Sequence, residues 1–365
     1  MPTVAQIVDA VVAGDTHVDT TSLCVASPVG AVLEHLTIDN DEDGFEQAVT
    51  WILKLMPSDR FLVGLEGTGS YGAGLSRALQ AVGIQVVEIE RPSRGERGRR
   101  GKSDAGDAEL AARKLLAMPA DRVPQPRSAD GEREALRLLT IGRESMTKHR
   151  TQLVNQLLAV LLTGNPQQQA MRKKDLVVGT LRGLVKARAG KSAGIAEQTR
   201  TAELRRISTL VLGLDAQLRD NDKQLRAILE PLAPQLLELV GVGPVGAAQA
   251  IVAYSHHGRC RDEAAFAALA GVNPIPASSG RVTRHRLNRG GDRRLNRTLH
   301  TIAVTRTRWD PRTQAYIQRR GKTMNDKEIR RVLKRYIARE LFKVLRTIDA
   351  LNPTTPTTIT TTTAA

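Results

Sequence analysis

Aromatic residues are scarce in this chain of 365 residues, in which Phe, Trp and Tyr together make up 3% of the sequence. A surface that binds single-stranded nucleic acid mainly by stacking bases on aromatic rings is therefore disfavoured. Cysteine is scarcer still, and Cys24 and Cys260 alone exclude a disulfide framework and indicate a reducing cytoplasm. No apolar run approaches the roughly 20 residues that span a bilayer, and the N-terminus lacks the pattern of a signal peptide. We therefore predict a cytoplasmic protein without a membrane partner.

Acidic residues are outnumbered, since 38 Asp plus Glu stand against 54 Lys plus Arg and leave a formal net charge of +16. A charge this large favours a polyanionic partner, above all nucleic acid, although it can also serve solubility alone. With few aromatic rings, phosphate contacts from Arg and Lys would carry most of the affinity. Binding should then weaken steeply as salt is added.

Two common ligand motifs are incomplete. His256, His257 and Cys260 lie close together, but no second pair of ligands is near them in the sequence, so a zinc site is disfavoured. Neither Gly-Lys-Ser triplet of the chain is preceded by the glycine that a phosphate-binding P-loop requires. The sequence therefore indicates neither a zinc centre nor ATP-driven chemistry.

Residues 1–126 have the pattern of an α/β domain. The predicted elements are strands over 10–15, 21–26 and 31–38, a helix over 41–55, a strand ending at 66, a helix over 71–81, a strand over 84–89 and a helix over 103–118. Strands that alternate with helices in the second half predict a partly parallel sheet covered by helices.

Residues 127–232 predict a helical arm with coiled-coil character. Apolar residues from Leu204 to Ile228 follow alternating three- and four-residue steps, and a weaker seam runs from Leu136 to Val160. The two seams can pair as an antiparallel hairpin within one chain, or between chains as a dimerisation arm. Asn221 on the first seam resembles a register-setting polar residue, although a bundle without oligomerisation explains it equally well. The basic segment 164–192 is expected to interrupt the helices.

Residues 233–351 predict a third, mostly helical domain, followed by a Thr-rich tail, 352–365, that is expected to be disordered. The domain opens with an apolar helix, then Gly241 and Gly243, then Pro244, which can begin a second helix. This pattern resembles a helix-hairpin-helix, which presents backbone N–H groups to phosphate. A plain tight turn between packed helices is the alternative.

Four carboxylates, which we call the acidic quartet, lie where predicted strands end or a helix begins: Asp15, Glu66, Asp104 and Asp107. Asp104 and Asp107, three residues apart, face the same side of a helix, where like charges repel unless a cation compensates. That pair alone could be a helix cap and a solvated residue. Together with two strand-end carboxylates that need a partner, it predicts a Mg²⁺ or Mn²⁺ site, since hard cations prefer oxygen ligands.

Two basic segments accompany the quartet. One is a glycine-containing loop before the helix at Ser103, and it is fit to grip a nucleic-acid backbone, although a charge run is often only a solvated face. The other follows a Ser-Ser-Gly loop, where a serine could act as a nucleophile once a base or metal activates it and guanidinium groups could bind phosphate. The candidate nucleic-acid-binding residues are Arg94, Arg97, Arg99, Arg100 and Lys102 in the first, and Arg281, Arg284, Arg286, Arg289, Arg293 and Arg294 in the second.

In their order and spacing these motifs resemble the DEDD transposases of the bacterial IS-one-ten family. The matching segments span nearly the whole chain and comprise residues 14–17, 66–72, 102–108, 279–280, 290–293, 308–311 and 334–340. The resemblance implies an RNase H-like, RuvC-type first domain, a coiled-coil arm and a C-terminal transposase domain. It also implies that the acidic quartet holds the metal and that Ser279, which directly precedes Gly280, is the nucleophile, with Ser278 as the second candidate.

The resemblance further implies an activity and partners. Such a protein would cut and rejoin double-stranded donor and target DNA through a serine–DNA ester, guided by a structured RNA from the element itself. It would act in the bacterial nucleoid as a dimer or tetramer, with an active site composed from two domains. Two alternatives remain open on the residues: a RuvC-like, metal-dependent, structure-specific endonuclease that hydrolyses DNA while Ser279 is structural, and a non-catalytic nucleic-acid-binding scaffold.

Overall fold

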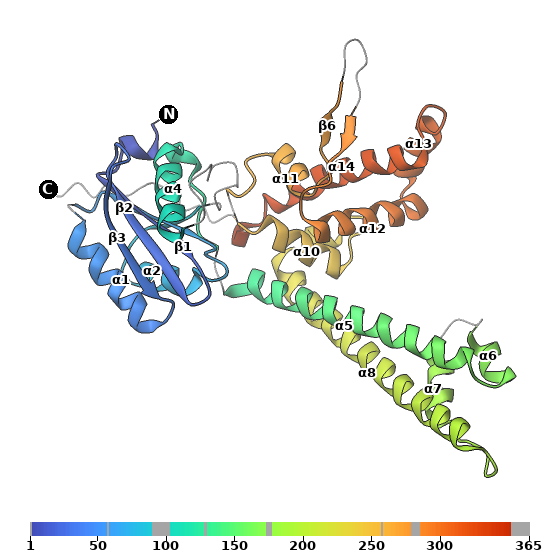
Figure 1. Cartoon of the computed structure of the whole chain (residues 1–365). Coiled ribbons are helices and arrows are strands. Elements are labelled where there is room, and N and C mark those ends of the chain that lie inside the picture. Colours follow the sequence, from blue (N-terminus) through green and yellow to red (C-terminus); the bar gives the residue numbers. More distant parts are fainter. Residues whose placement is uncertain are drawn as a thin grey trace. The chain divides into compact units, whose positions relative to one another are not determined.

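The computed structural model describes residues 2–56, 58–89, 103–127, 130–172, 177–256, 258–278 and 285–351 (Figure 1). By its internal contacts the chain divides into two units. The larger unit comprises Met1–Glu134 and Ala253–Ala365, and the arm unit comprises Ala135–Val252. Each unit is described by itself below.

The N-terminal part of the larger unit is built on a five-stranded sheet with the order β3-β2-β1-β4-β5. Its strands are β1 (Ala10–Thr16), β2 (Thr20–Ala26), β3 (Val32–Asp39), β4 (Phe61–Glu66) and β5 (Val86–Ile89). The first three pair antiparallel, whereas β1, β4 and β5 run parallel. The predicted α/β domain with a partly parallel sheet is therefore confirmed.

Helices cover both faces of this sheet, because side chains along each strand alternate between the faces. Val11 and Ala13 of β1 point into a core shared with α4 (Asp104–Ala117). Ala10 and Val12 point into the opposite core, which α1 (Glu42–Leu55) and α2 (Ala73–Ala81) close. The strands lie within one or two residues of their predicted positions. Side-chain caps mark the starts of α1 and α4, since Asp41 accepts from the Gly44 N–H and Ser103 from the Gly106 N–H.

The arm unit contains two long helices, α5 (Gly131–Leu162) and α8 (Ile195–Leu232), which pack antiparallel within one chain. Arg143 on α5 donates to the Asn221 side chain on α8 at 3.1 Å, and Asn221 donates to the Leu139 carbonyl at 3.1 Å. Nearer the far end, Arg150 pairs with Asp215 at 2.5 Å. Of the two pairings that the seams allowed, the structure has the hairpin within the chain, and buried Asn221 is bonded across it.

Shorter helices complete the arm unit: α6 (Pro166–Arg172), α7 (Val178–Lys186) and α9 (Pro234–Leu237). The segment between the long helices is thus interrupted, as its basic, irregular sequence predicted. Pro231 lies inside the last turn of α8, where its missing N–H leaves one carbonyl, a turn back, without its helical donor. The helix before Gly241 is short α9, which ends at Leu237.

The C-terminal part of the larger unit is mostly helical, as predicted. Its elements are the end of α10 (Pro244–Tyr254), α11 (Glu263–Leu269), β6 (Pro274–Pro276), β7 (His285–Leu287), α12 (Arg293–Trp309), α13 (Pro311–Arg320) and α14 (Asp326–Leu345). Tyr254, Phe266 and Phe342 pack with ring centroids 5.7 to 6.5 Å apart and anchor α14 against α11. The hairpin of β6 and β7 was not predicted. In the described part of the chain, no helix has the length and apolarity to cross a bilayer.

Candidate metal centre and nucleic-acid interface

Two members of the acidic quartet lie at the ends of adjacent parallel strands. Gly14 is paired with Leu65 in the register of β1 and β4, so Asp15 and Glu66 follow at the same edge of the sheet. Both are buried, with 1% and 5% of their surface exposed. Gly64 contributes indirectly, because a Cβ there would lie 2.1 Å from Ile89 and 2.9 Å from Leu115 of α4. The glycine lets α4 pack closely on this part of the sheet.

The other two members lie in the first turn of α4. The Ser103 side chain caps the helix at 3.2 Å from the Gly106 nitrogen, which fixes where α4 begins. Asp104 is half exposed, whereas Asp107, one turn further on, is 2% exposed. A helix N-terminus stabilises negative charge, so this end of α4 favours the two carboxylates.

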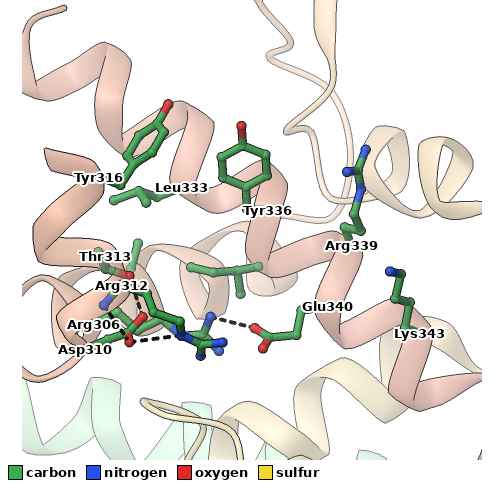
Figure 2. Close-up of a pocket in the computed structure, with 12 residues that line it drawn as sticks. Arg306, Asp310, Arg312, Thr313, Tyr316, Leu333, Tyr336, Arg339, Glu340 and Lys343 are labelled. Atoms are coloured by element: carbon green, nitrogen blue, oxygen red, sulfur yellow. Dashed lines mark hydrogen bonds and ion pairs between the residues drawn. The ribbon is translucent and has the colours of Figure 1, made fainter. Parts of the chain in front are cut away.

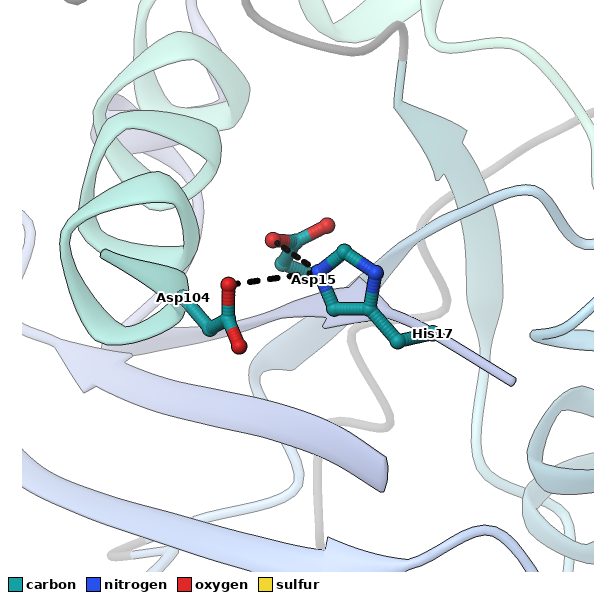
Figure 3. Close-up of side chains that lie close together, drawn as sticks. All are labelled: Asp15, His17 and Asp104. Atoms are coloured by element: carbon teal, nitrogen blue, oxygen red, sulfur yellow. Dashed lines mark hydrogen bonds and ion pairs between the residues drawn. The ribbon is translucent and has the colours of Figure 1, made fainter. Parts of the chain in front are cut away.

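His17 joins two members of the quartet at one point. Its Nε2 lies 3.1 Å from the Asp15 Oδ2 and 3.3 Å from the Asp104 Oδ1, and Figure 3 shows both carboxylates directed at this one ring nitrogen. One ligand atom from each of these three residues lies within 4.8 Å of the other two. The sequence pattern alone assigns His17 no role beyond its place in the segment 14–17. Its place two residues after a strand-end aspartate was the signal that could have identified it.

The donor set fits a divalent cation. Asp15 and Asp104 supply the oxygen atoms that hard cations prefer, and His17 supplies a nitrogen ligand. Glu66 and Asp107 stand on the adjoining strand end and on the next turn of α4, outside the group of three that approach within 4.8 Å. The structure therefore brings Asp15, Asp104 and His17 together. The other two carboxylates lie on β4 and α4, outside this group of three.

A further carboxylate at the same sheet has a different role. Glu88 on β5 is bound by the Arg127 guanidinium, with Nε at 2.8 Å, and by the Thr68 hydroxyl at 2.9 Å. Burial raises the pKa of Glu88, but the hydrogen bonds from Arg127 and Thr68 outweigh it and hold that pKa below its ordinary value. Because the Arg127 N–H also donates to Thr68, this pair ties residue 127 to the turn after Glu66.

Basic side chains gather between β7, α12 and α14, where none of the described lining residues is acidic. The cavity there, which we call the basic cleft, has a volume of about 390 Å³ and its charged or titratable lining residues are Arg289, Arg293, Arg297, His300 and Lys334. Burial lowers the pKa of Lys334, and neighbouring Arg330 and Arg331 lower it further. Burial, Arg330 and Lys334 likewise lower the pKa of His300. Crowded like charges of this kind favour an anion such as phosphate.

Some of the predicted nucleic-acid-binding residues line the basic cleft, some lie on other parts of the described structure, and others lie outside it. Arg289 and Arg293 line the basic cleft, whereas Arg286 lies on β7 and Arg294 on α12. His300 and Lys334, which also line it, were not predicted. The predicted residues that lie outside the described part of the chain are Ser279, Arg281, Arg284, Arg94, Arg97, Arg99, Arg100 and Lys102.

The Gly241–Gly243 segment forms a tight connection in the arm unit. Gly241 has φ +81°, a conformation that favours glycine, and the Val242 N–H donates to the Leu239 carbonyl at 2.9 Å. Pro244 begins α10, as predicted. The segment thus has short α9 on one side and α10 on the other.

Two family models match the chain. The model of the IS110-type DEDD transposases, described as a transposase, matches residues 12–166. The model described as the transposase IS116/IS110/IS902 family matches residues 233–318. The first match contains the whole acidic quartet, and the second contains most of the basic cleft.

Two relatives come from insertion elements of Streptomyces. An uncharacterized 44.8 kDa protein of insertion element IS116 from Streptomyces clavuligerus is 27% identical over 302 residues, which cover 70% of this chain and 74% of that protein. An uncharacterized 43.6 kDa protein of insertion element IS110 from Streptomyces coelicolor is 32% identical over 146 residues, 38% of this chain and 36% of that protein.

These matches define the class of the protein as an insertion-sequence transposase. The chain belongs to the IS110 family of these transposases. Membership implies DNA transposition and a DNA substrate, and the DEDD name of the first model suggests a divalent metal at the acidic residues.

Proposed function

We propose that this protein cuts and rejoins donor and target DNA, with the acidic quartet holding Mg²⁺ or Mn²⁺ and Ser279 attacking the phosphodiester. The single observation that carries the proposal is the convergence of buried Asp15 and half-exposed Asp104 on one point beside His17. Those residues come from a strand end and a helix start that are 89 residues apart. A divalent cation would hold these like charges together.

The chemistry follows from the residue types. A bound divalent ion would polarise the scissile phosphate and help deprotonate the attacking hydroxyl. The Ser279 Oγ would form a bond to phosphorus while the bond from phosphorus to the departing deoxyribose oxygen breaks, and that oxygen would take up a proton. The serine–DNA ester retains a phosphodiester linkage, so rejoining to a new strand needs no ATP. The basic cleft supports this proposal because its cations can hold DNA phosphates.

The proposed partners are nucleic acids and further copies of the chain. The net charge of +16 and the basic cleft support binding to double-stranded DNA. Gly241 and Gly243 would form a helix-hairpin-helix contact with the DNA backbone, for which α10 supplies a helix N-terminus. The family resemblance adds a structured guide RNA, an RuvC-type first domain, a coiled-coil arm and a dimer or tetramer. Sequencing of nucleic acid that copurifies with the protein tests the guide RNA.

A covalent trap tests the serine chemistry. Full-length protein is incubated with labelled donor DNA and Mg²⁺, the reaction is stopped in denaturant, and labelled DNA that migrates with the protein is measured. We expect the adduct with the unaltered protein and with Ser278→Ala, and its loss in Ser279→Ala. Asp15→Asn should lose both the adduct and the cleavage.

The same assay separates the alternatives. Cleavage that persists in Ser279→Ala without any adduct would show hydrolysis by water instead of serine attack. DNA binding with no cleavage in the unaltered protein, unchanged by Asp15→Asn and by chelation of the metal, would point to a non-catalytic scaffold.

A further inference from the structure

Two motifs near the C-terminus have no role in the chemistry above, although they belong to the segments that resemble the family. They are residues 308–311, at the junction of α12 and α13, and residues 334–340 on α14. The two segments meet at one cavity of about 370 Å³, which we call the aromatic pocket (Figure 2). That volume is within the range of pockets that bind small ligands.

Aromatic rings form one wall of the aromatic pocket. Tyr316 of α13 and Tyr336 of α14 pack edge to face with centroids 5.8 Å apart, and Leu333 and Ile337 lie beside them. Tyr336 is 49% exposed, in a protein whose aromatic content is only 3%. A half-exposed aromatic side chain beside aliphatic side chains offers a flat ligand a surface on which to stack.

Paired polar groups form the opposite side of the pocket. Arg306, which is 8% exposed, donates to Glu340 at 2.6 Å, and Asp310 accepts from the Thr313 hydroxyl at 2.6 Å. Figure 2 shows these side chains together across the pocket from the two tyrosines. Asp310 is buried and caps α13, so Glu340, which is 30% exposed, is the carboxylate that can accept a hydrogen bond from the exocyclic amino group of a nucleobase. The ligand that fits both sides is therefore flat and aromatic, with polar edges.

The charge around the pocket favours a ligand with phosphate. Arg312, Arg339 and Lys343 line the pocket in addition to the buried Arg306, against the two carboxylates Asp310 and Glu340. Arg312 pairs with Asp310 and Arg339 with Glu263, so the lining keeps a net positive charge that disfavours a cationic peptide. Tyr336 also lines a neighbouring cavity of about 740 Å³, together with Arg331, Lys334 and Arg335. Lys334 in turn lines the basic cleft. A strand whose phosphates bind in the basic cleft could therefore continue along α14 to the aromatic pocket.

We propose that the aromatic pocket binds one unstacked nucleotide of a nucleic-acid strand, with its base on Tyr336 and its phosphate among Arg312 and Lys343. A base within a regular duplex is stacked on both sides and cannot enter, so the pocket selects an unpaired or extruded position. The inference rests on the proposed function only in taking nucleic acid as the partner. It assigns a second recognition site that is separate from the acidic quartet.

Fluorescence of 2-aminopurine tests the site directly. The full-length protein is titrated with single-stranded DNA and RNA of one sequence, each with a single 2-aminopurine, and stacking on Tyr336 should quench the fluorescence. Tyr336→Leu should abolish the quenching and weaken binding of the single strand roughly 10-fold, the scale of one base–aromatic stack. Tyr336→Phe should preserve both. Trp309→Leu is the matched control, since Trp309 is 74% exposed on the adjoining helix end and does not line the pocket.

Each outcome bears on the proposal. Quenching with either the DNA or the RNA strand, lost in Tyr336→Leu and retained in Trp309→Leu, supports it and identifies the source of the nucleotide. Equal effects of the two leucine variants, or no quenching with either strand, overturn it. Tyr336→Leu is also tested in the covalent trap with duplex DNA. That assay measures the serine–DNA adduct and does not depend on base stacking, so failure of the pocket is distinguishable from failure of the proposed function.

Discussion

Replacement of Asp104 by Asn separates a metal ligand from a structural residue. The ligand oxygens of Asp15 and Asp104 lie within 4.8 Å of each other, and two like charges at that distance repel by about 1 kcal/mol in water-like surroundings. The low value applies because Asp104 is 47% exposed. The substitution removes this repulsion, but it also weakens the contact with His17 and removes an interaction of about 0.5 kcal/mol with the N-terminus of α4. Without metal, Asp104→Asn should therefore change the free energy of unfolding by no more than about 0.5 kcal/mol.

With metal present the expected result is different. At a free ion concentration ten times the Kd, one site stabilises the folded state by about 1.4 kcal/mol, and a tenfold weaker Kd reduces this to about 0.4 kcal/mol. Asp104→Asn should thus lose about 1 kcal/mol of the stabilisation that Mg²⁺ or Mn²⁺ adds.

Urea denaturation followed by circular dichroism, in chelator and in metal, measures both quantities for the full-length protein. Glu109→Gln is the control, because Glu109 lies on the same helix and contacts His35 and Arg113 instead of the cluster. The reasoning is refuted if Asp104→Asn unfolds more easily in chelator yet keeps the full stabilisation by metal.

Two further substitutions test the carboxylate beside the site and the basic cleft. Glu88→Gln should lower the free energy of unfolding by about 2 kcal/mol at neutral pH, since Arg127 would lose its partly buried partner. Because folding lowers the pKa of Glu88 from 4.5, this stabilisation is present above pH 4.5 and is lost as the pH falls through the lower, folded value. If the difference in free energy of unfolding between Glu88→Gln and the unaltered protein stayed constant down to pH 3, the Glu88–Arg127 ion pair would not be its cause. Lys334→Ala should weaken DNA binding and reduce the slope of log K against log salt by about one, whereas Lys54→Ala on α1 should leave the slope unchanged. Equal slopes for both variants would exclude Lys334 as a phosphate contact.

Local signals carried most of the fold prediction. Alternating apolar residues gave the strands of the N-terminal sheet, and Asp41 and Ser103 marked the helix starts because their side chains can bond a free N–H two or three residues on. Strand ends at Asp15 and Glu66 then placed two carboxylates at one edge of a parallel sheet. The contacts that the sequence did not specify join residues far apart in the chain. Asn221 was ambiguous for this reason, since its partner Arg143 lies 78 positions away.

The features that the sequence did not predict have physical causes. β6 and β7 have three residues each, and β6 begins and ends with proline, which cannot donate to a sheet, so no strand pattern was visible. The ring of His17 could be assigned to the site only once β1 and α4 were brought together. The aromatic pocket takes its lining from three helices, and the scarcity of aromatic residues in the whole chain gave no indication that Tyr316 and Tyr336 lie together.

The central claim is that the strand ends of β1 and β4 and the start of α4 form one divalent-metal centre. Crystals of the full-length protein grown with Mn²⁺ test this directly by anomalous scattering. We predict a Mn²⁺ peak at bonding distance, about 2.0–2.6 Å, from carboxylate oxygens of both Asp15 and Asp104. Full Mn²⁺ occupancy elsewhere, or no peak beside these residues at millimolar Mn²⁺, would contradict it.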